Sequence, residues 1–405
     1  MASTSKINKI AITGVLIMLS LLSACEDGGH FLFSDPYDYL SQEPTTARYP
    51  VFIESEPVLL AMYEPAYGSF IGLYTDTLPR PDGRVIAEVE SALGVSHDTF
   101  MEVIRLGDSF PTLWVLECIA EQKIPVIVIL PPETGNPFGN RWEDILTETA
   151  MAFSEFPVPM FVVLYPIGPS WAPADAATYI AFFRYARAIF AQHAPHVAFI
   201  WSVDADMKDF SDNFMNYFPG RLAVDWVGLS LFASSCEPIE IPVDFYYAFQ
   251  HDFPIMLNIG ISHFSTTDHR YRIAETAATL EKVYHTILTD FPRVKMINYM
   301  DISRFEYNGR DYRISQDPGL RIAYLDSIQG FSPPSGGLDS ASIPIRSAYN
   351  AFVEEGRIYL DVRILEEMGK PVPGQTRWID GARRVDMSLL ELSAEVGERR
   401  IVLQR

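Results

Sequence analysis

The sequence is poor in cysteine and in basic residues. Only three of its 405 residues are cysteine. Cys118 and Cys236 lie too far apart to make a disulfide framework, so we expect both to be reduced. Lysine and arginine together number 31 against 52 aspartates and glutamates, which gives a formal net charge of −21. Because binding to nucleic-acid phosphates requires a basic face, this balance argues against a nucleic-acid partner.

An apolar run near the N-terminus is too short for a membrane-spanning helix. Residues 1–24 begin with Lys6 and Lys9, continue as this apolar run and lead to Leu-Ser-Ala-Cys at positions 22–25, which resembles a bacterial lipoprotein cleavage box. We therefore expect residues 1–24 to be removed, Cys25 to carry a lipid and residues 25–47 to form a tether. Such a protein is extracytoplasmic and is held at the bacterial cell membrane by acyl chains.

Short apolar, β-rich runs alternate with amphipathic helical patterns from about residue 58 onward, as in repeated β-α units. No Gly-rich phosphate loop follows the first run, which argues against an open doubly wound sheet. The pattern predicts an α/β chain: a (β/α)8 TIM barrel over residues 48–330, a linker over 331–341 and a small α+β domain over 342–405. The expected barrel strands are Phe70–Tyr74, Met101–Leu106, Pro125–Leu130, Met160–Tyr165, Ala198–Ser202, Trp226–Phe232, Ile255–Ile259 and Lys295–Met300, and the expected helices include Arg84–Leu93, Thr112–Gln122, Ala174–Gln192 and Tyr271–Thr289.

The carboxyl ends of barrel strands are where such folds place their chemistry. In this chain those positions are rich in aromatic side chains and carboxylates. Sugar rings stack on aromatic faces and sugar hydroxyls bond to carboxylates and amides, so the mouth indicates a carbohydrate ligand. Trp171 and Trp201 are the candidates for sugar stacking, with a core role equally open, whereas Trp114 and Trp226 are expected to be structural. The candidate substrate-binding residues are Tyr74, Tyr165, Trp171, Trp201, Phe232, Asn258, His263 and Tyr299.

Several segments resemble glycoside hydrolase family 26, the β-mannanase-like barrels, across most of residues 48–330. The run Val197–Ser202 is similar to the family's fifth strand, Asn216–Gly220 to its Tyr-Pro-Gly turn, and Val224–Leu229 to its Val-Asp-Trp-Val-Gly sixth strand. Further on, Pro254–Leu257 and Gly260–His263 are similar to the seventh strand. The resemblance implies the same barrel fold.

The resemblance also assigns the family's two catalytic glutamates to positions that lack a carboxyl group here. The acid/base position falls on Pro166 and the nucleophile position on Asn258, two residues before Gly260. Retaining glycosidases need two carboxyls about 5–5.5 Å apart, one to protonate the leaving oxygen and one to attack the sugar. A proline has no proton to donate, and an amide cannot form the glycosyl ester. Phe232 stands where the family often has a tyrosine, which again indicates lost hydrolysis.

Three hypotheses about function remain open. The first is a cell-surface protein that binds a β-linked polysaccharide or cell-wall glycan without hydrolysing it. The second is a β-mannanase-like hydrolase that uses displaced carboxylates, with Glu133, Asp204 and Asp206 as candidates, although Glu133 could lie in a solvated turn and the aspartates could cap a turn. The third is a structural or protein-contact role in the cell envelope. His263 is expected to be a hydrogen-bonded structural histidine, and no metal or other cofactor is expected, because no second His or Cys lies at ligand spacing.

Residues 342–405 resemble the small copper amine oxidase N-terminal-like module, or stalk domain, of bacterial surface proteins. Residues Glu355–Gly369 predict a strand that turns directly into a short helix ending at glycine, and Arg384–Glu391 is a weaker copy of this pattern. No His or Cys occurs between Ser342 and Arg405, so copper binding is not expected. We expect the module to pack on the barrel or to contact envelope material.

Overall fold

The computed structural model describes residues 46–405 except for 66–67, 77–84, 133–137, 139–141, 170, 172, 174, 208, 234–238, 305–308, 330, 332–341, 356, 380–381, 391, 393, 398–399 and 404–405. The predicted signal peptide, Cys25, Glu133, Cys236 and nearly all of the predicted linker lie outside the described residues. None of the helices in the described part combines the length and the apolar character that crossing a bilayer requires.

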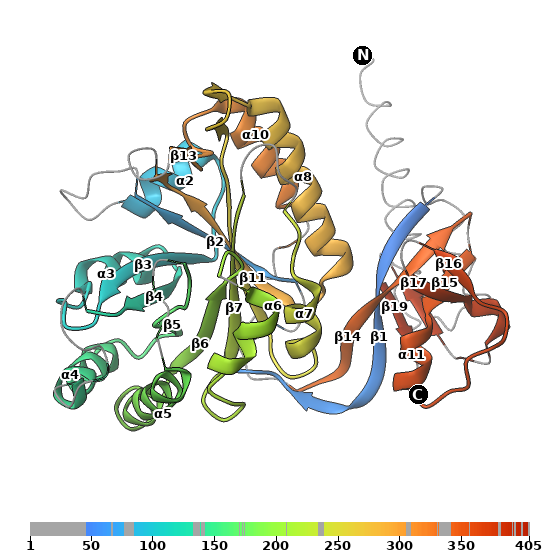
Figure 1. Cartoon of the computed structure of the whole chain (residues 1–405), viewed down its shortest axis with the longest axis horizontal. Helices are drawn as coiled ribbons and strands as arrows, with labels where there is room; N and C mark the ends of the chain where they lie inside the picture. Colours follow the sequence, from blue (N-terminus) through green and yellow to red (C-terminus); the bar gives the residue numbers. More distant parts are fainter. Residues whose placement is uncertain are drawn as a thin grey trace, which may run out of the picture.

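Eight parallel strands close into a barrel, in the order β11-β2-β3-β4-β5-β6-β7-β8 (Figure 1). All eight predicted strands are confirmed. Because both faces of each strand are covered, the strands are near-continuous apolar runs. Their bounds are β2 (Phe70–Thr75), β3 (Thr99–Arg105), β4 (Ile124–Leu130), β5 (Met160–Leu164), β6 (Val197–Asp204), β7 (Trp226–Ala233), β8 (Ile255–Ile261) and β11 (Val294–Asp301).

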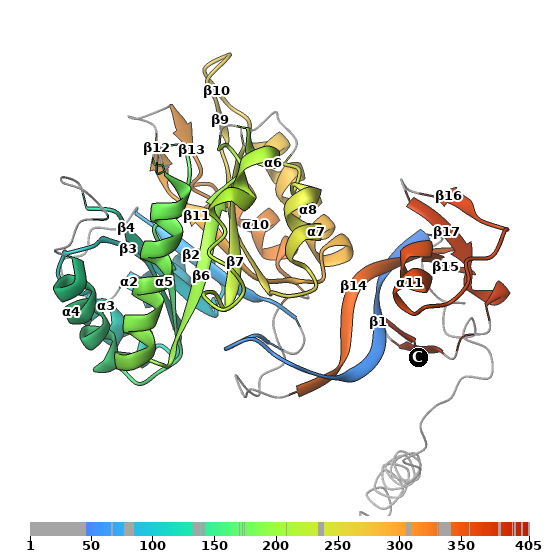
Figure 2. The ribbon, with the colours of Figure 1, turned by 60° about the horizontal axis from the view of Figure 1, so that its bottom comes forward.

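Helices surround the barrel (Figures 1 and 2). The four helices named from the sequence are confirmed with small shifts at their ends. Asp175 and Asp317 cap α5 and α10, each accepting two backbone N–H groups. Trp114 and the free thiol of Cys118 are buried on α3, as expected. The bounds are α2 (Val85–Leu93), α3 (Thr112–Ala120), α4 (Trp142–Ser154), α5 (Ala176–His193), α6 (Phe210–Asn213), the 3-10 helix η2 (Phe214–Tyr217), α7 (Val243–Phe249), α8 (Ile273–Asp290) and α10 (Pro318–Ser327).

The amino-terminal end of the barrel is filled by side chains and closed by the segment that enters it. Trp226 is fully buried, meets Phe161 edge-on with ring centroids 5.2 Å apart, and donates its indole N–H to the Met62 carbonyl at 2.8 Å. The Tyr63 hydroxyl donates to the His196 carbonyl at 2.6 Å. Trp226 is therefore structural, as predicted, and the carboxyl end of the barrel is the end to consider for ligand contact.

A second, seven-stranded sheet has the order β16-β17-β15-β14-β1-β19-β18. Its N-terminal strand β1 pairs antiparallel with β14 and parallel with β19. This differs from the predicted barrel start at residue 48, because β1 belongs to this sheet and Val51 lies in its core beside Ile401. An apolar strand does not reveal from its own sequence which distant strands it will join. The bounds are β1 (Thr46–Leu59), β14 (Ser342–Glu354), β15 (Arg357–Asp361), β16 (Arg377–Ile379), β17 (Ala382–Asp386), β18 (Ala394–Gly397) and β19 (Arg400–Leu403).

The predicted strand-to-helix turn and its copy are both present in this sheet. Strand β15 leads directly into α11 (Val362–Glu367), and β17 leads into the 3-10 helix η3 (Met387–Leu389). In each case the last strand residue, Asp361 or Asp386, accepts a backbone N–H from two residues ahead. Gly369 then takes a positive φ of 66° just after α11. On the barrel side, the Arg363 guanidinium lies 5.1 Å from the ring centroid of Tyr247 on α7.

Candidate functional site

Several half-buried apolar side chains lie at the carboxyl-terminal mouth of the barrel. Tyr74, Val103, Leu130 and Phe232 are half-buried there and pack against the interior of the barrel. The Phe232 ring meets the Tyr312 ring at 5.4 Å with an interplanar angle of 66°. A Cβ added at Gly260 would lie 2.7 Å from the Phe232 ring and 3.1 Å from the Tyr312 ring. The absence of a side chain at Gly260 therefore makes room for this aromatic pair.

A chain of hydrogen bonds crosses the barrel interior below the mouth. Thr99 Oγ1 donates to Asn298 Oδ1 at 2.9 Å, and Asn298 Nδ2 donates to Asn258 Oδ1 at 3.1 Å. Asn258 Nδ2 in turn donates to Ser230 Oγ at 3.2 Å. A Cβ at Gly72 would lie 2.0 Å from both the Thr99 and the Asn298 oxygens, so this crossing requires glycine. Asn258 thus uses both ends of its amide to hold three strands together.

Asp204 is a half-buried carboxylate at the end of β6. Its Oδ1 accepts the Asp206 N–H at 2.9 Å, which closes a turn at the end of β6. Burial, reinforced by the nearby Asp206 carboxylate, raises the pKa of Asp204 to about 6. In the described part of the chain its Oδ2 makes no hydrogen bond. Asp204 is therefore a group that can donate or accept a hydrogen bond at the mouth near neutral pH, whereas Asp206 is exposed.

The segment after β5 packs against α5 instead of opening into the mouth. Tyr165, which the sequence proposed as a sugar contact, is fully buried and stacks on Phe182 at 4.7 Å. This is a correction: Tyr165 has a positive φ of 47°, and its ring lies in the layer between barrel and helices. Trp171 is half-buried and meets Tyr165 edge-on at 5.5 Å, so part of its indole stays accessible. Pro166, where the sequence resemblance places the family's acid/base, is half-buried.

Trp201 and Tyr299 are two further corrections. Trp201 is 0% exposed and packs against Phe218, Phe245 and Phe249 outside the barrel wall. Tyr299 is equally buried, and its hydroxyl donates to the Tyr312 carbonyl at 2.9 Å. Alternate residues of a strand point to opposite faces, and both faces of these strands are apolar. The sequence therefore could not show which aromatic residues point toward the helices.

His263 is buried just after β8. Its backbone N–H donates to the Asp311 carbonyl at 2.8 Å, and its Nε2 lies 3.7 Å from Asp311 Oδ2. Burial lowers the pKa of His263, which favours the neutral ring. The Arg313 guanidinium donates to both Asp311 oxygens, at 2.8 and 2.6 Å. His263 therefore has the structural position expected of it, although its Nδ1 is buried without a hydrogen-bond partner.

The sequence did not reveal the contribution of two short hairpins at the mouth. One is formed by β9 (Phe264–Ser265) and β10 (Arg270–Tyr271), and the other by β12 (Ser303–Arg304) and β13 (Arg310–Asp311). They follow β8 and β11 and lie next to each other (Figure 2). Two-residue strands are too short for any periodic pattern, and Tyr271, which the sequence placed at the start of a helix, lies in β10 instead. Within the described ranges, no three His, Cys, Asp or Glu residues gather to hold a metal ion.

No protein-family model matches the chain, and no curated protein matches its sequence. Among solved structures, the catalytic core of a xylanase A is similar at 10% identity and a TM-score of 0.47, covering 65% of this chain and 99% of that one. The catalytic domain of a Bacillus sp. JAMB-750 GH26 endo-β-1,4-mannanase is similar at 12% identity and a TM-score of 0.47, and the match covers 70% of this chain and 96% of that one. A mutant xylanase A of P. fluorescens subsp. cellulosa in complex with xylopentaose is similar at 9% identity and a TM-score of 0.48, and the match covers 65% of this chain and 98% of that one. These similarities concern the fold.

Proposed function

We propose that this chain is a lipid-anchored, extracytoplasmic protein that binds a β-linked polysaccharide or cell-wall glycan at its barrel mouth without hydrolysing it. The observation that carries the proposal is the environment of Asn258. The family resemblance assigns the nucleophile to this position, and both ends of the Asn258 amide are occupied by Asn298 and Ser230. An amide cannot form a glycosyl ester, and Pro166 cannot protonate a leaving group.

The lining of the mouth supports binding. Phe232 and Tyr74 offer half-buried aromatic rings at the mouth. Trp171, on the segment that packs against α5, is also only half-buried. Asp204 adds a carboxyl oxygen that no described group satisfies. Aromatic faces accept the apolar face of a sugar ring, and a carboxyl group bonds its hydroxyls. Half-buried aromatic rings together with the Asp204 carboxyl therefore suit a pyranose.

The proposed location follows from the sequence alone. The Leu-Ser-Ala-Cys box at positions 22–25 supports lipidation of Cys25, and acyl chains can hold the protein at a membrane. The stalk-like module over residues 342–405 would then lie in the envelope together with the barrel.

One observation favours hydrolysis as a second candidate function. A carboxyl whose pKa is raised to about 6 is suited to act as a general acid near neutral pH, and Asp204 is such a group. A displaced mechanism would pair Asp204 with a second carboxylate, for which Asp206 and Glu133 are the candidates.

A single set of incubations distinguishes the two functions. The chain from residue 26 onward is mixed with β-mannan, mixed-linkage glucan, xylan and peptidoglycan, and both retention on the polymer and soluble sugars by mass are measured. We expect retention on at least one polymer with no release of sugar. Release that is lost in Asp204→Asn but kept in Asp144→Asn would establish hydrolysis instead. Asp144→Asn is the matched control because it makes the same change at an exposed position on α4 and is not one of the candidate carboxylates.

A further inference from the structure

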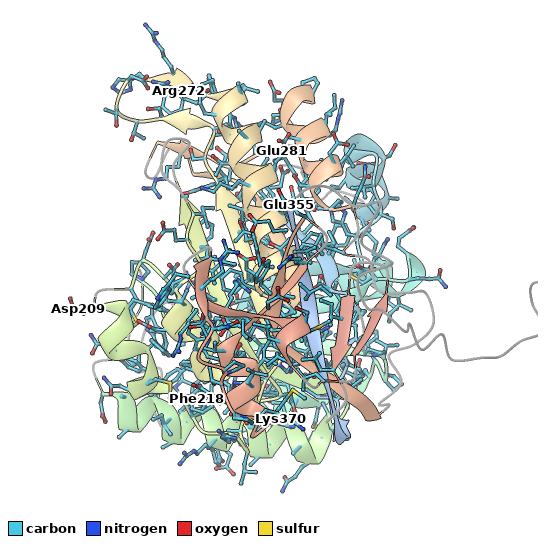
Figure 3. The ribbon with its side chains drawn as sticks, turned by 90° about the vertical axis from the view of Figure 1, so that its right-hand side faces the viewer. Asp209, Phe218, Arg272, Glu281, Glu355 and Lys370 are labelled. Atoms are coloured by element: carbon cyan, nitrogen blue, oxygen red, sulfur yellow. The ribbon has the colours of Figure 1, made fainter. Side chains whose placement is uncertain are left out.

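Tyr271 is an exposed aromatic residue on the rim of the mouth. It lies on the β9–β10 hairpin opposite Phe264 and is 57% exposed. The hairpin begins three residues after β8 ends, so it projects from the carboxyl end of the barrel (Figure 2). Arg272, the next residue in the chain, is labelled at the outer edge of the molecule in Figure 3. The hairpin that carries Tyr271 therefore stands at the same end of the barrel as the proposed site, and Tyr271 was not among the site residues that the sequence indicated.

One face of the Tyr271 ring is covered and the other is open. The buried His263 ring stacks on it, with centroids 5.4 Å apart and an interplanar angle of 26°. Phe264 meets it edge-on at 5.2 Å and 68°. With His263 against one face and Phe264 at its side, the large exposed fraction of Tyr271 belongs to the opposite face. The ring is thus presented flat to solvent.

The support beneath Tyr271 is rigid. The His263 N–H donates to the Asp311 carbonyl at 2.8 Å, and the His263 carbonyl accepts the Arg272 N–H at 2.7 Å. Two nitrogens of the Arg313 guanidinium in turn donate hydrogen bonds to the two carboxylate oxygens of Asp311. An aromatic ring that is already fixed in place loses little conformational entropy when a ligand stacks on it. The loss of side-chain conformational entropy that ordinarily weakens binding to an exposed aromatic residue is therefore small for Tyr271.

The charges around the ring balance. Arg313 pairs with Asp311, and Arg272 pairs with Asp268 and Glu275. Arg270 precedes Tyr271 in the strand, so its side chain lies on the other face of the hairpin. These paired arginines, Arg313 and Arg272, therefore do not favour an acidic sugar over a neutral one. A neutral ring is the ligand that this surface suits.

We infer that Tyr271 is a sugar-stacking platform on the barrel rim, which takes the apolar face of a neutral pyranose unit in a glycan whose other units occupy the mouth. This inference rests on the proposed glycan binding and extends it to a second contact point. A glycan must be several units long to reach both the platform and the mouth. Tyr271 should therefore matter for long chains and not for short oligosaccharides.

The test compares Tyr271→Ala, Tyr271→Phe and Tyr185→Ala in the chain from residue 26 onward. Tyr185 is the matched control because it is 42% exposed on the surface helix α5. Affinity electrophoresis is run in the neutral polysaccharide that retains the wild type, and binding of its disaccharide is measured by calorimetry. Melting temperatures equal to that of the wild type confirm that the variants fold.

For the polysaccharide, we expect Tyr271→Ala to weaken affinity about fivefold and Tyr271→Phe to remain within about twofold, because Phe keeps the stacking face. Disaccharide affinity should not change. If the wild type is retained and Tyr271→Ala binds as well as Tyr185→Ala, the inferred role of Tyr271 is wrong, whereas the proposed glycan binding is supported. If no polymer retains the wild type, the proposed function and the platform both fail.

Discussion

Asn298 Nδ2 donates a hydrogen bond to Asn258 Oδ1 at 3.1 Å, which links β11 to β8 inside the barrel. This bond gives Asn258 a structural role in the barrel wall. It lies in the middle of a polar chain that runs from Thr99 to Ser230. Removal of Asn258 would leave buried donors and acceptors without partners, and each such group costs about 1–3 kcal/mol.

The first prediction concerns this chain of hydrogen bonds from Thr99 to Ser230. Asn258→Ala should lower the free energy of unfolding by about 2–4 kcal/mol, because Asn298 Nδ2 loses its acceptor and a cavity forms inside the barrel. Urea denaturation measures this change. Asn216→Ala, at an exposed asparagine, is the control and should stay within about 0.5 kcal/mol. Equal stability of the two variants would mean that the polar chain does not support the barrel.

The second prediction separates Trp201 from ligand binding. Trp201→Ala should cost about 3–5 kcal/mol of stability, because the indole fills the space between β6 and α7, yet retention per folded molecule should not change. Thermal melting and retention on the polysaccharide measure the two effects. Trp378→Ala is the matched control, since Trp378 is 78% exposed and its loss should be nearly neutral. Normal stability with lost retention would return Trp201 to the binding surface.

A third prediction follows from the carboxyl group of Asp204. Its pKa in the folded state, about 6, lies above the ordinary value of 3.8, so the folded protein holds this proton more tightly than the unfolded chain does. The contribution of Asp204 to the free energy of unfolding is therefore most favourable below pH 3.8. It falls as the pH rises from 3.8 to about 6 and is constant above that pH.

Denaturation of the wild type and Asp204→Asn at several pH values measures this contribution. The variant should gain stability relative to the wild type as the pH rises through that interval. Asp206→Asn should keep most of the pH dependence of the wild type, because burial is the larger cause of the raised pKa of Asp204. Parallel curves for the wild type and Asp204→Asn would mean that the carboxyl is not buried in the way described.

A fourth prediction concerns the second sheet. Val51 is 0% exposed, and β1 joins β14 to β19, so Val51→Asp should open this sheet while the barrel stays folded. Hydrogen exchange should show faster exchange in β14, β15 and β19 and unchanged exchange in β4 and β5. Ile322→Asp, at a position 58% exposed on α10, serves as the control. Uniform loosening of both parts would show that they unfold as one unit.

The barrel could be predicted from the sequence because each strand is a compact apolar run and the helices between them are amphipathic. The strand-to-helix turn at Asp361 was also visible, because an aspartate cap and the later Gly369 mark its two ends. What could not be predicted is which way each aromatic residue points. Trp201 and Phe232 both lie in strands buried on two sides, and only the closed barrel assigns one to the helices and the other to the mouth.

Long-range pairing and short hairpins were likewise beyond the sequence. Strand β1 pairs Thr46 with Glu354 and Val51 with Ile401, and its local composition carries no information about such distant segments. Tyr271 depends on the stack with His263, and these two residues were brought together by a hairpin too short to show a pattern. The family resemblance pointed to Asn258 and Pro166, but the hydrogen bonds that occupy the Asn258 amide became visible only in three dimensions.

Binding without hydrolysis is tested most directly under single-turnover conditions. An oligosaccharide of the polymer that retains the protein is mixed with an equal amount of the chain from residue 26 onward. Mass spectrometry then follows both the intact protein and the sugar over a long incubation. The account predicts a sugar of unchanged length and a protein of unchanged mass. Shortened sugar, or a protein that gains the mass of a glycosyl unit, would contradict it.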